Sequence, residues 1–288
     1  MKSTLVCIHV MPLEIEMFER FIIRYKHALQ YLDENDDVTI KATLNLNPLL
    51  TDWDNSKLKQ QYFIDKFNSH FHDVKNINEI ILDDSVWGTT QQKRDSYKLD
   101  YDQFIFVDND IAIHPLLLKT QLIGSYQIDG MYIISPSIPR WWDQSWDVLV
   151  HRDYKNSEIG IATHKETFDK VFTQEVKDIQ MRQLSTIKFG CGMHTLYSKS
   201  FWEFVQIPDS FKGYGPEDTF AMYASQIAIQ KRYPIKQFVL DGVFITEDYH
   251  NREPLIKEMI SPINMKETFY ESAKSRMKDE LEIFLNRI

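Results

Sequence analysis

"YDQFIFVDNDIAIHP", residues 101–115, is the stretch that decides the fold. Its apolar run from Phe104 to Val107 is typical of a buried strand, and it ends abruptly in Asp108, Asn109 and Asp110. Asp and Asn hydrogen-bond their own backbone and leave strands readily, so a turn alone would explain these residues. Two carboxylates at the end of a buried strand also suit a hard cation beside phosphate, because such cations take oxygen ligands.

Strand and helix patterns alternate outward from this stretch through the first half of the chain. Further strands are predicted at 4–10, 38–46, 78–84 and 131–138, with helices between them. Alternation of this kind gives βαβ units and a mainly parallel, mixed central sheet flanked by helices. We therefore expect an α/β fold with a Rossmann-like first half. Ligands gather at the carboxyl ends of strands in such sheets, which is where Asp108 and Asp110 stand.

The second half is less regular, but it contains no repeat, no low-complexity tract and no obvious linker. A polar loop at 139–156 holds three Trp, and a glycine turn at 213–216 leads into a helix. One helical stripe ends the chain, formed by Met265, Phe269, Ala273, Met277, Leu281 and Leu285. We expect this stripe to pack on the core. A single domain over 1–288 is predicted, divided into 1–138, 139–254 and a helical 255–288.

The composition excludes several classes of protein. A net charge of −9 argues against a nucleic-acid surface, which needs a basic stripe. Two cysteines make no disulfide framework, so nothing points to secretion. The start resembles no signal peptide, and no run approaches the roughly 18 apolar residues of a membrane span. A cytoplasmic protein without a transmembrane segment is expected.

The strand-end Asp-x-Asp is similar to motifs of two enzyme families. In haloacid-dehalogenase-type phosphatases the first Asp is a nucleophile and the second an acid/base. In nucleotide-sugar glycosyltransferases of the GT-A type the pair holds Mn²⁺ or Mg²⁺ on the donor diphosphate. The phosphatase motif usually stands near the start of its domain, with Gly-Thr or similar after it, whereas Ile111 follows here. Lys93 and Arg94 in the preceding helix also favour the transferase, because many GT-A enzymes place a basic residue there to reach the nucleotide.

Residues 189–220 resemble the acceptor-side motif of the β-1,4-galactosyltransferases and the related polypeptide N-acetylgalactosaminyltransferases. The corresponding residues stand in the same order: Phe189-Gly190, Ser198-Lys199, Phe201 and Gly215-Pro216-Glu217-Asp218. Tyr214 replaces the Trp of that motif, and Pro216 replaces its second Gly. Downstream, His250 stands in a polar loop after a strand, where that family has the histidine that completes its metal site.

This resemblance implies a metal-dependent GT-A glycosyltransferase that uses a nucleotide-sugar donor, with UDP as the expected nucleotide. Asp110 and His250 would bind Mn²⁺ or Mg²⁺, and Asp108 would bind the metal or the ribose. The implied nucleotide-sugar contacts are Lys93, Arg94, Asp108, Asn109, Gly190 and Gly192. Asp218 would be the base of an inverting transfer, and Glu217 would bind the acceptor. Residues 1–138 would then bind the nucleotide-sugar and 139–254 the acceptor.

The acceptor, a glycan or glycoconjugate, is expected at an aromatic surface. The candidates are Trp141, Trp142, Trp146 and Tyr214, together with Glu217. Aromatic rings suit the C–H faces of sugars, although packing of each Trp against the core is equally expected. A retaining transferase, a phosphatase with Asp108 as nucleophile and a non-catalytic sugar-binding protein are the alternatives.

Overall fold

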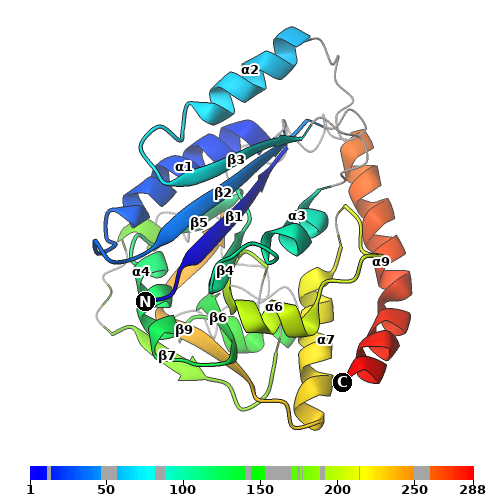
Figure 1. The fold of residues 1–288 in the computed structure, drawn as a ribbon. Coiled ribbons are helices and arrows are strands. Elements are labelled where there is room, and N and C mark those ends of the chain that lie inside the picture. The colour runs from blue at the N-terminus through cyan, green and yellow to red at the C-terminus, as the bar shows by residue number, and fades with distance from the viewer. Residues whose placement is uncertain are drawn as a thin grey trace.

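The computed structural model describes residues 1–11, 14–46, 57–81, 88–139, 144–152, 170–173, 176, 178–188, 192–213, 215–248 and 260–288. Helices cover a central sheet on both faces (Figure 1). Within the described residues nine strands form this sheet, in the order β3-β2-β1-β4-β8-β6-β9-β5, with β7 paired to β9.

The strands are β1 (Thr4–Val10), β2 (Val38–Asn45), β3 (Asn76–Ile81), β4 (Gln103–Val107), β5 (Ile111–Ile113), β6 (Met131–Ser137), β7 (Gln180–Gln183), β8 (His194–Ser198) and β9 (Ile235–Glu247). The helices are α1 (Ile15–Leu29), α2 (Lys57–Asn68), α3 (Thr89–Ser96), α4 (Leu117–Tyr126), the 3₁₀ helix η3 (Gln144–Leu149), α6 (Lys199–Val205), α7 (Glu217–Gln230) and α9 (Ile260–Arg287). Among the helices described, none is long and apolar enough to cross a bilayer.

The first half of the chain builds a parallel sheet with the strand order of a Rossmann-like unit. Strands β3, β2, β1 and β4 run parallel, and Val6 of β1 aligns with Ile40 of β2 and Ile105 of β4. Antiparallel pairing begins where β8 joins β4, with His194 opposite Val107. The predicted α/β fold with a mixed sheet is confirmed. Because β1 and β4 are parallel neighbours, their carboxyl ends lie at one edge, beside Asp108.

Two apolar clusters fill the space between the sheet and its helices. One cluster takes residues from α1 and α4, including Phe18, Phe21 and Leu122, and the other takes residues from α6, α7 and α9. Strand β2 is buried on both of its faces. Its polar residues alternate with its apolar ones, and all four are buried: Thr39, Lys41, Thr43 and Asn45.

Strand β9 links the main sheet to the short strand that follows the two aspartates. Its first half pairs with β6 and β7, and its last residues pair with β5, where Ile111 aligns with Glu247. Gly242 lies between these halves with φ of 109°. A Cβ atom there would lie 2.5 Å from the Asp178 carbonyl oxygen, so only glycine fits this bend. The bend brings the end of β9 to Asp110.

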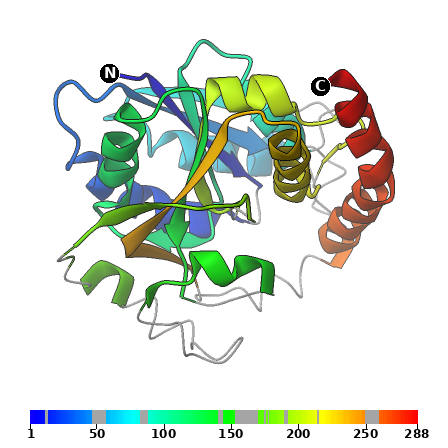
Figure 2. The same cartoon turned by 90° about the horizontal axis from the view of Figure 1, so that it is seen from below.

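The last helix, α9, lies outermost on the α7 side of the molecule (Figure 2). Ala273 is buried, and Met277 and Leu281 pack partly, as the predicted stripe requires. Leu285 was predicted in the same stripe but is 39% exposed, and Phe284 is buried in its place. Phe284 packs edge-on against Phe204 of α6, which turns its neighbour Leu285 toward solvent.

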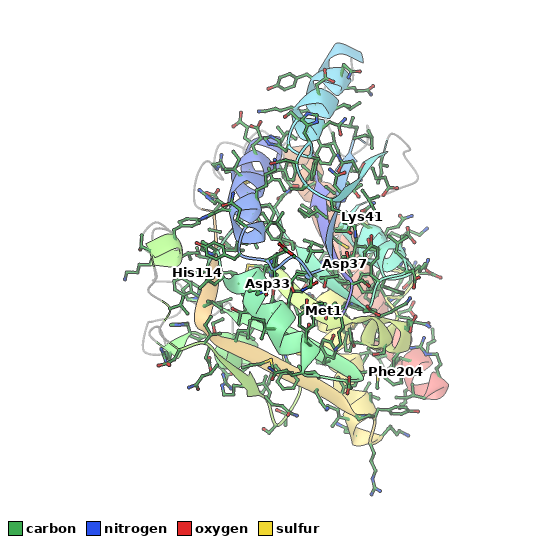
Figure 3. The ribbon with its side chains drawn as sticks, turned by 60° about the vertical axis from the view of Figure 1, so that its left-hand side comes forward. Met1, Asp33, Asp37, Lys41, His114 and Phe204 are labelled. Carbon is green, nitrogen blue, oxygen red and sulfur yellow. The ribbon has the colours of Figure 1, made fainter. Side chains whose placement is uncertain are left out.

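The end of the sheet opposite the aspartates is closed by the polar turn at 33–37. Asp33 and Asp37 lie on this turn near Met1 (Figure 3). Asp37 pairs with Lys75 at 2.6 Å, and its carbonyl accepts the backbone N–H of Thr4 at 2.8 Å. The turn therefore holds the start of β1. The candidate site lies at the other end of the strands, where Asp108 follows β4.

Candidate active site

The Asp-Asn-Asp segment leaves β4 at the centre of the sheet. All five residues of β4 are buried, whereas Asp108 and Asp110 are partly exposed. The backbone N–H of Asp108 donates to the Met193 carbonyl at 3.0 Å. Asn109 is buried, and its side-chain amide donates to the His9 carbonyl at 3.0 Å and to Glu14 Oε2 at 3.1 Å. Asn109, predicted to contact the nucleotide-sugar, therefore directs its amide to the end of β1 in this structure.

A buried ion pair crosses from α3 to α7 beside these aspartates. Lys93 Nζ donates to Glu217 Oε1, and the Thr90 hydroxyl donates to Glu217 Oε2 at 3.2 Å. The side chains of Lys93 and Glu217 are only 10% and 8% exposed. Burial alone would lower the pKa of Lys93, but the carboxylates of Glu217 and Asp108 outweigh it and raise that pKa above its usual value. Lys93 is therefore held as a cation.

Asp108 lies next to Lys93 and within electrostatic reach of three further carboxylates. Burial raises the pKa of Asp108 to about 7. The ammonium of Lys93 opposes this rise, whereas three neighbouring carboxylates add to it, those of Asp110, Glu217 and Asp218. Burial also raises the pKa of Asp218 to about 6, and Glu217 adds to that rise. The cluster therefore carries more negative charge than Lys93 can balance.

Asp218 begins α7 next to Glu217, and its carboxylate has a different environment. Its Oδ1 accepts the backbone N–H of Thr219 at 2.6 Å. A Cβ atom on Gly192 would lie 3.1 Å from Asp218 Oδ2, which is tighter than ordinary contact. Gly192 was predicted to let the backbone approach the donor. Here it lets the backbone approach the Asp218 carboxylate.

The two predicted basic residues of α3 face different parts of the molecule. Arg94 Nη1 donates to the carbonyls of Pro208 at 2.5 Å and Phe211 at 3.1 Å, and its Nε lies 3.3 Å from Asp209. Successive helix residues are about 100° apart, so Lys93 reaches the carboxylates while Arg94 holds the loop at 206–211. A cavity of about 610 Å³ borders Arg94, and its lining includes none of the four carboxylates.

Several predicted site residues lie outside the described part of the chain. These are His250, Phe189, Gly190, Trp141, Trp142 and Tyr214, and the side chain of Trp146, whose backbone belongs to η3. No group of three or more His, Cys, Asp or Glu side chains arranged to hold a metal ion is found among the described residues, which do not include His250. Those predictions stay open.

Thr90 is a residue that the sequence patterns did not indicate. Its hydroxyl donates to Glu217, and its backbone N–H donates to the Gly213 carbonyl at 3.0 Å, which fixes the start of α3 on the turn before α7. A threonine in the first turn of a helix is unremarkable in sequence. Only the 127-residue separation between the two partners, closed by the fold, reveals its role.

The ion pair gives the first testable prediction. Lys93→Met is expected to lower the free energy of unfolding by about 3–5 kcal/mol, because it leaves Glu217 buried among carboxylates without its cation. The measurement is urea unfolding followed by circular dichroism. The double variant Lys93→Met/Glu217→Met should recover most of the loss, since a buried pair can be replaced by apolar side chains of similar volume.

Lys75→Met provides the matched control for that prediction. Lys75 and Asp37 are 2.6 Å apart, but their side chains are 62% and 50% exposed, so the loss should stay below about 1 kcal/mol. Equal destabilisation by the two lysine substitutions would contradict the importance given to the buried pair.

Comparison with known proteins finds similarity at the level of the fold. No family model and no curated protein matches the sequence. The mannosyltransferase PcManGT from Pyrobaculum calidifontis, in complex with GDP-Man and Mn²⁺, matches with a TM-score of 0.52 and 11% identity over 99% of this chain and 72% of that chain. S. aureus TarS matches with a TM-score of 0.50 and 11% identity over 99% of this chain.

This chain spans only 43% of the TarS chain. An inositol-1-phosphate CTP transferase from T. maritima matches at a TM-score of 0.46 and 10% identity, over 90% of this chain and 96% of that chain. At such identities the likeness establishes the fold alone. The chain has a GT-A-like α/β fold, as the sequence predicts, and it shares this fold with PcManGT and TarS.

Proposed function

We propose that the protein is a metal-dependent glycosyltransferase that moves a sugar from a nucleotide-sugar to a glycan or glycoconjugate, with inversion and with Asp218 as the base. The observation that carries the proposal is a cluster of four carboxylates after β4, those of Asp108, Asp110, Glu217 and Asp218, beside Lys93, which donates to Glu217. In an α/β sheet this edge is where ligands bind.

The charge of the cluster fits a divalent cation. Repulsion among the carboxylates contributes to the raised pKa of Asp108, and a cation beside Asp108 and Asp110 would relieve it. Asp108, Asp110 and His250 are the proposed ligands. When bound, the cation would offset the charge that develops on the departing nucleoside diphosphate.

Chain connectivity supports the inclusion of His250. The backbone N–H of Asp248 donates to the Asp110 carbonyl at 2.6 Å. His250 is two residues further along, and two residues span at most about 7 Å. The chain therefore reaches the proposed third ligand within two residues of a backbone contact with the second.

The contacts of Glu217 and Asp218 support the division of their roles. Both carboxylate oxygens of Glu217 already accept hydrogen bonds within the protein, one from Lys93 and one from Thr90. A carboxylate neutralised in this way is a poor proton acceptor, which favours Asp218 as the base that takes the proton of the acceptor hydroxyl. Glu217 is then proposed to contact the acceptor, and Lys93 to face the donor phosphates.

The remaining predicted contacts complete the proposal. On the donor side we propose Gly190 and Gly192, with Arg94 holding the loop at 206–211 and Asn109 holding the end of β1. We propose that Tyr214, Trp141, Trp142 and Trp146 contact the acceptor. We propose a single domain with its donor half at 1–138 and its acceptor half at 139–254.

A thermal-shift screen tests this function. Nucleoside diphosphates and nucleotide-sugars, UDP-linked and GDP-linked, would be added with and without Mn²⁺, and the midpoint of unfolding measured. A ligand at 100 times its Kd raises the unfolding free energy by about 2.7 kcal/mol. We expect one nucleotide-sugar to raise the midpoint of unfolding, and only when Mn²⁺ is present. Hydrolysis of simple phosphate esters through a phosphorylated Asp108 would instead support the phosphatase. Binding of a nucleotide-sugar without any turnover would support a non-catalytic sugar-binding protein.

A further inference from the structure

The end of β9 is tied to the proposed cation site through Asp248. This residue is 2% exposed, and its backbone N–H donates to the Asp110 carbonyl at 2.6 Å. The bond extends the antiparallel pairing of β5 with β9, in which Ile111 aligns with Glu247. Asp248 therefore fixes the backbone of one proposed ligand and stands two residues before His250.

The carboxylate of Asp248 is held by two arginines of helix α1. Its Oδ2 lies 3.0 Å from Arg20 Nε and 3.5 Å from Arg24 Nη1. Residues four apart lie on the same face of a helix, so both guanidinium groups reach one carboxylate. The Arg24 guanidinium also lies 4.9 Å from the centre of the Phe172 ring. Two charged pairs thus attach the end of β9 to a helix packed in the core.

We propose that Asp248, held by Arg20 and Arg24, is a positioning residue for the cation site. It fixes the Asp110 backbone, and it precedes His250 by two residues in the chain. Both arginines engage its Oδ2, and the part assigned to it is to orient the ligands. Partners of this kind commonly set the orientation of metal ligands. The inference rests on the proposed function, because it requires that site to bind a cation.

Binding of Mn²⁺ alone, followed by the EPR signal of the free ion, tests this assignment. Asp248→Asn and Arg20→Gln are each expected to weaken Mn²⁺ binding about 10-fold or more. Loss of a residue that orients metal ligands has an effect of this size in other metal sites. Unfolding without metal is measured in parallel. A purely structural role would lower stability and leave the Mn²⁺ affinity of the folded protein unchanged.

Asp241→Asn is the matched control. Asp241 lies on β9, the strand that Asp248 directly follows, and its Oδ2 is 3.0 Å from Arg182 Nε, the same atoms and distance as in the Asp248–Arg20 pair. We expect this variant to bind Mn²⁺ like the wild type. The double variant Asp248→Asn/Arg20→Gln should lose little more affinity than either single variant, because both remove one interaction.

The outcomes separate the two proposals. If the wild type binds no Mn²⁺, the proposed function fails. If the wild type binds Mn²⁺ while Arg20→Gln, Arg24→Gln and Asp248→Asn bind it equally well, the positioning role fails. Should Asp248→Asn not fold, the arginine variants decide the question, since both arginines are partly exposed and remove only their side of the pairing.

Discussion

Asp218→Asn is expected to lower kcat by about 10²–10⁴-fold, the usual contribution of a positioned general base, and to leave donor and Mn²⁺ binding unchanged. Asparagine has nearly the same shape and can still accept the backbone N–H of Thr219, so the start of α7 should hold. What it lacks is the ability to take a proton from the acceptor hydroxyl. Initial rates with the nucleotide-sugar found in the screen, together with its Kd, measure both quantities.

Glu217→Gln tests whether the loss of kcat is specific to Asp218. The amide oxygen can still accept from Thr90 or Lys93, but the charge that balances Lys93 is lost. We expect a higher acceptor KM and a lower unfolding free energy, with a smaller fall in kcat than for Asp218→Asn. The reverse order of kcat losses would move the base to Glu217.

The pH dependence of the reaction supplies a second measure of the same residue. Asp218 acts as a base only when ionised, and in the unliganded protein its pKa is raised to about 6. Activity should therefore fall as the pH drops through this pKa. A nearby cation favours the ionised form, so the acid limb should lie at or below pH 6 when the metal is bound. An α-linked donor should give a β-linked product by NMR, and an α-linked product would remove Asp218 from this role.

Much of the parallel half of the fold could be predicted from the sequence, because its signals are local. The apolar run at 104–107 followed by Asp108 and Asn109 contains both a buried strand and its end. The spacing of Phe18, Phe21 and Ile22 likewise predicts the buried face of α1. Such patterns depend on neighbours within one or two turns, and the structure keeps them.

The pairing of distant side chains could not be read in this way. Lys93 and Arg94 are adjacent and both basic, yet only the fold decides that Lys93 meets Glu217, 124 positions away, while Arg94 meets the loop at Pro208. The pairing of Asp248 with Arg20 depends on α1 and on the bend at Gly242, which are separated by more than 200 positions. Sequence order offers candidate residues for a site, and the tertiary contacts supply the partners of those that the structure describes.

Asp110→Ala is expected to weaken Mn²⁺-dependent binding of the nucleoside diphosphate by more than about 100-fold, beyond the upper end of the loss caused by removing an outer-shell partner. The substitution removes a proposed metal ligand but keeps the backbone carbonyl that accepts the N–H of Asp248. The strand pairing of β5 with β9 should therefore survive, and the variant should fold.

Added ligand should stabilise the wild type but not this variant. Without metal, the substitution removes one of the carboxylates that raise the pKa of Asp108. With Mn²⁺ and the nucleoside diphosphate, the wild type should gain stability and the variant should not. Isothermal titration calorimetry and thermal unfolding measure the two effects separately. Undiminished nucleotide binding in Asp110→Ala, with or without Mn²⁺, would show that the strand-end aspartates form only a turn.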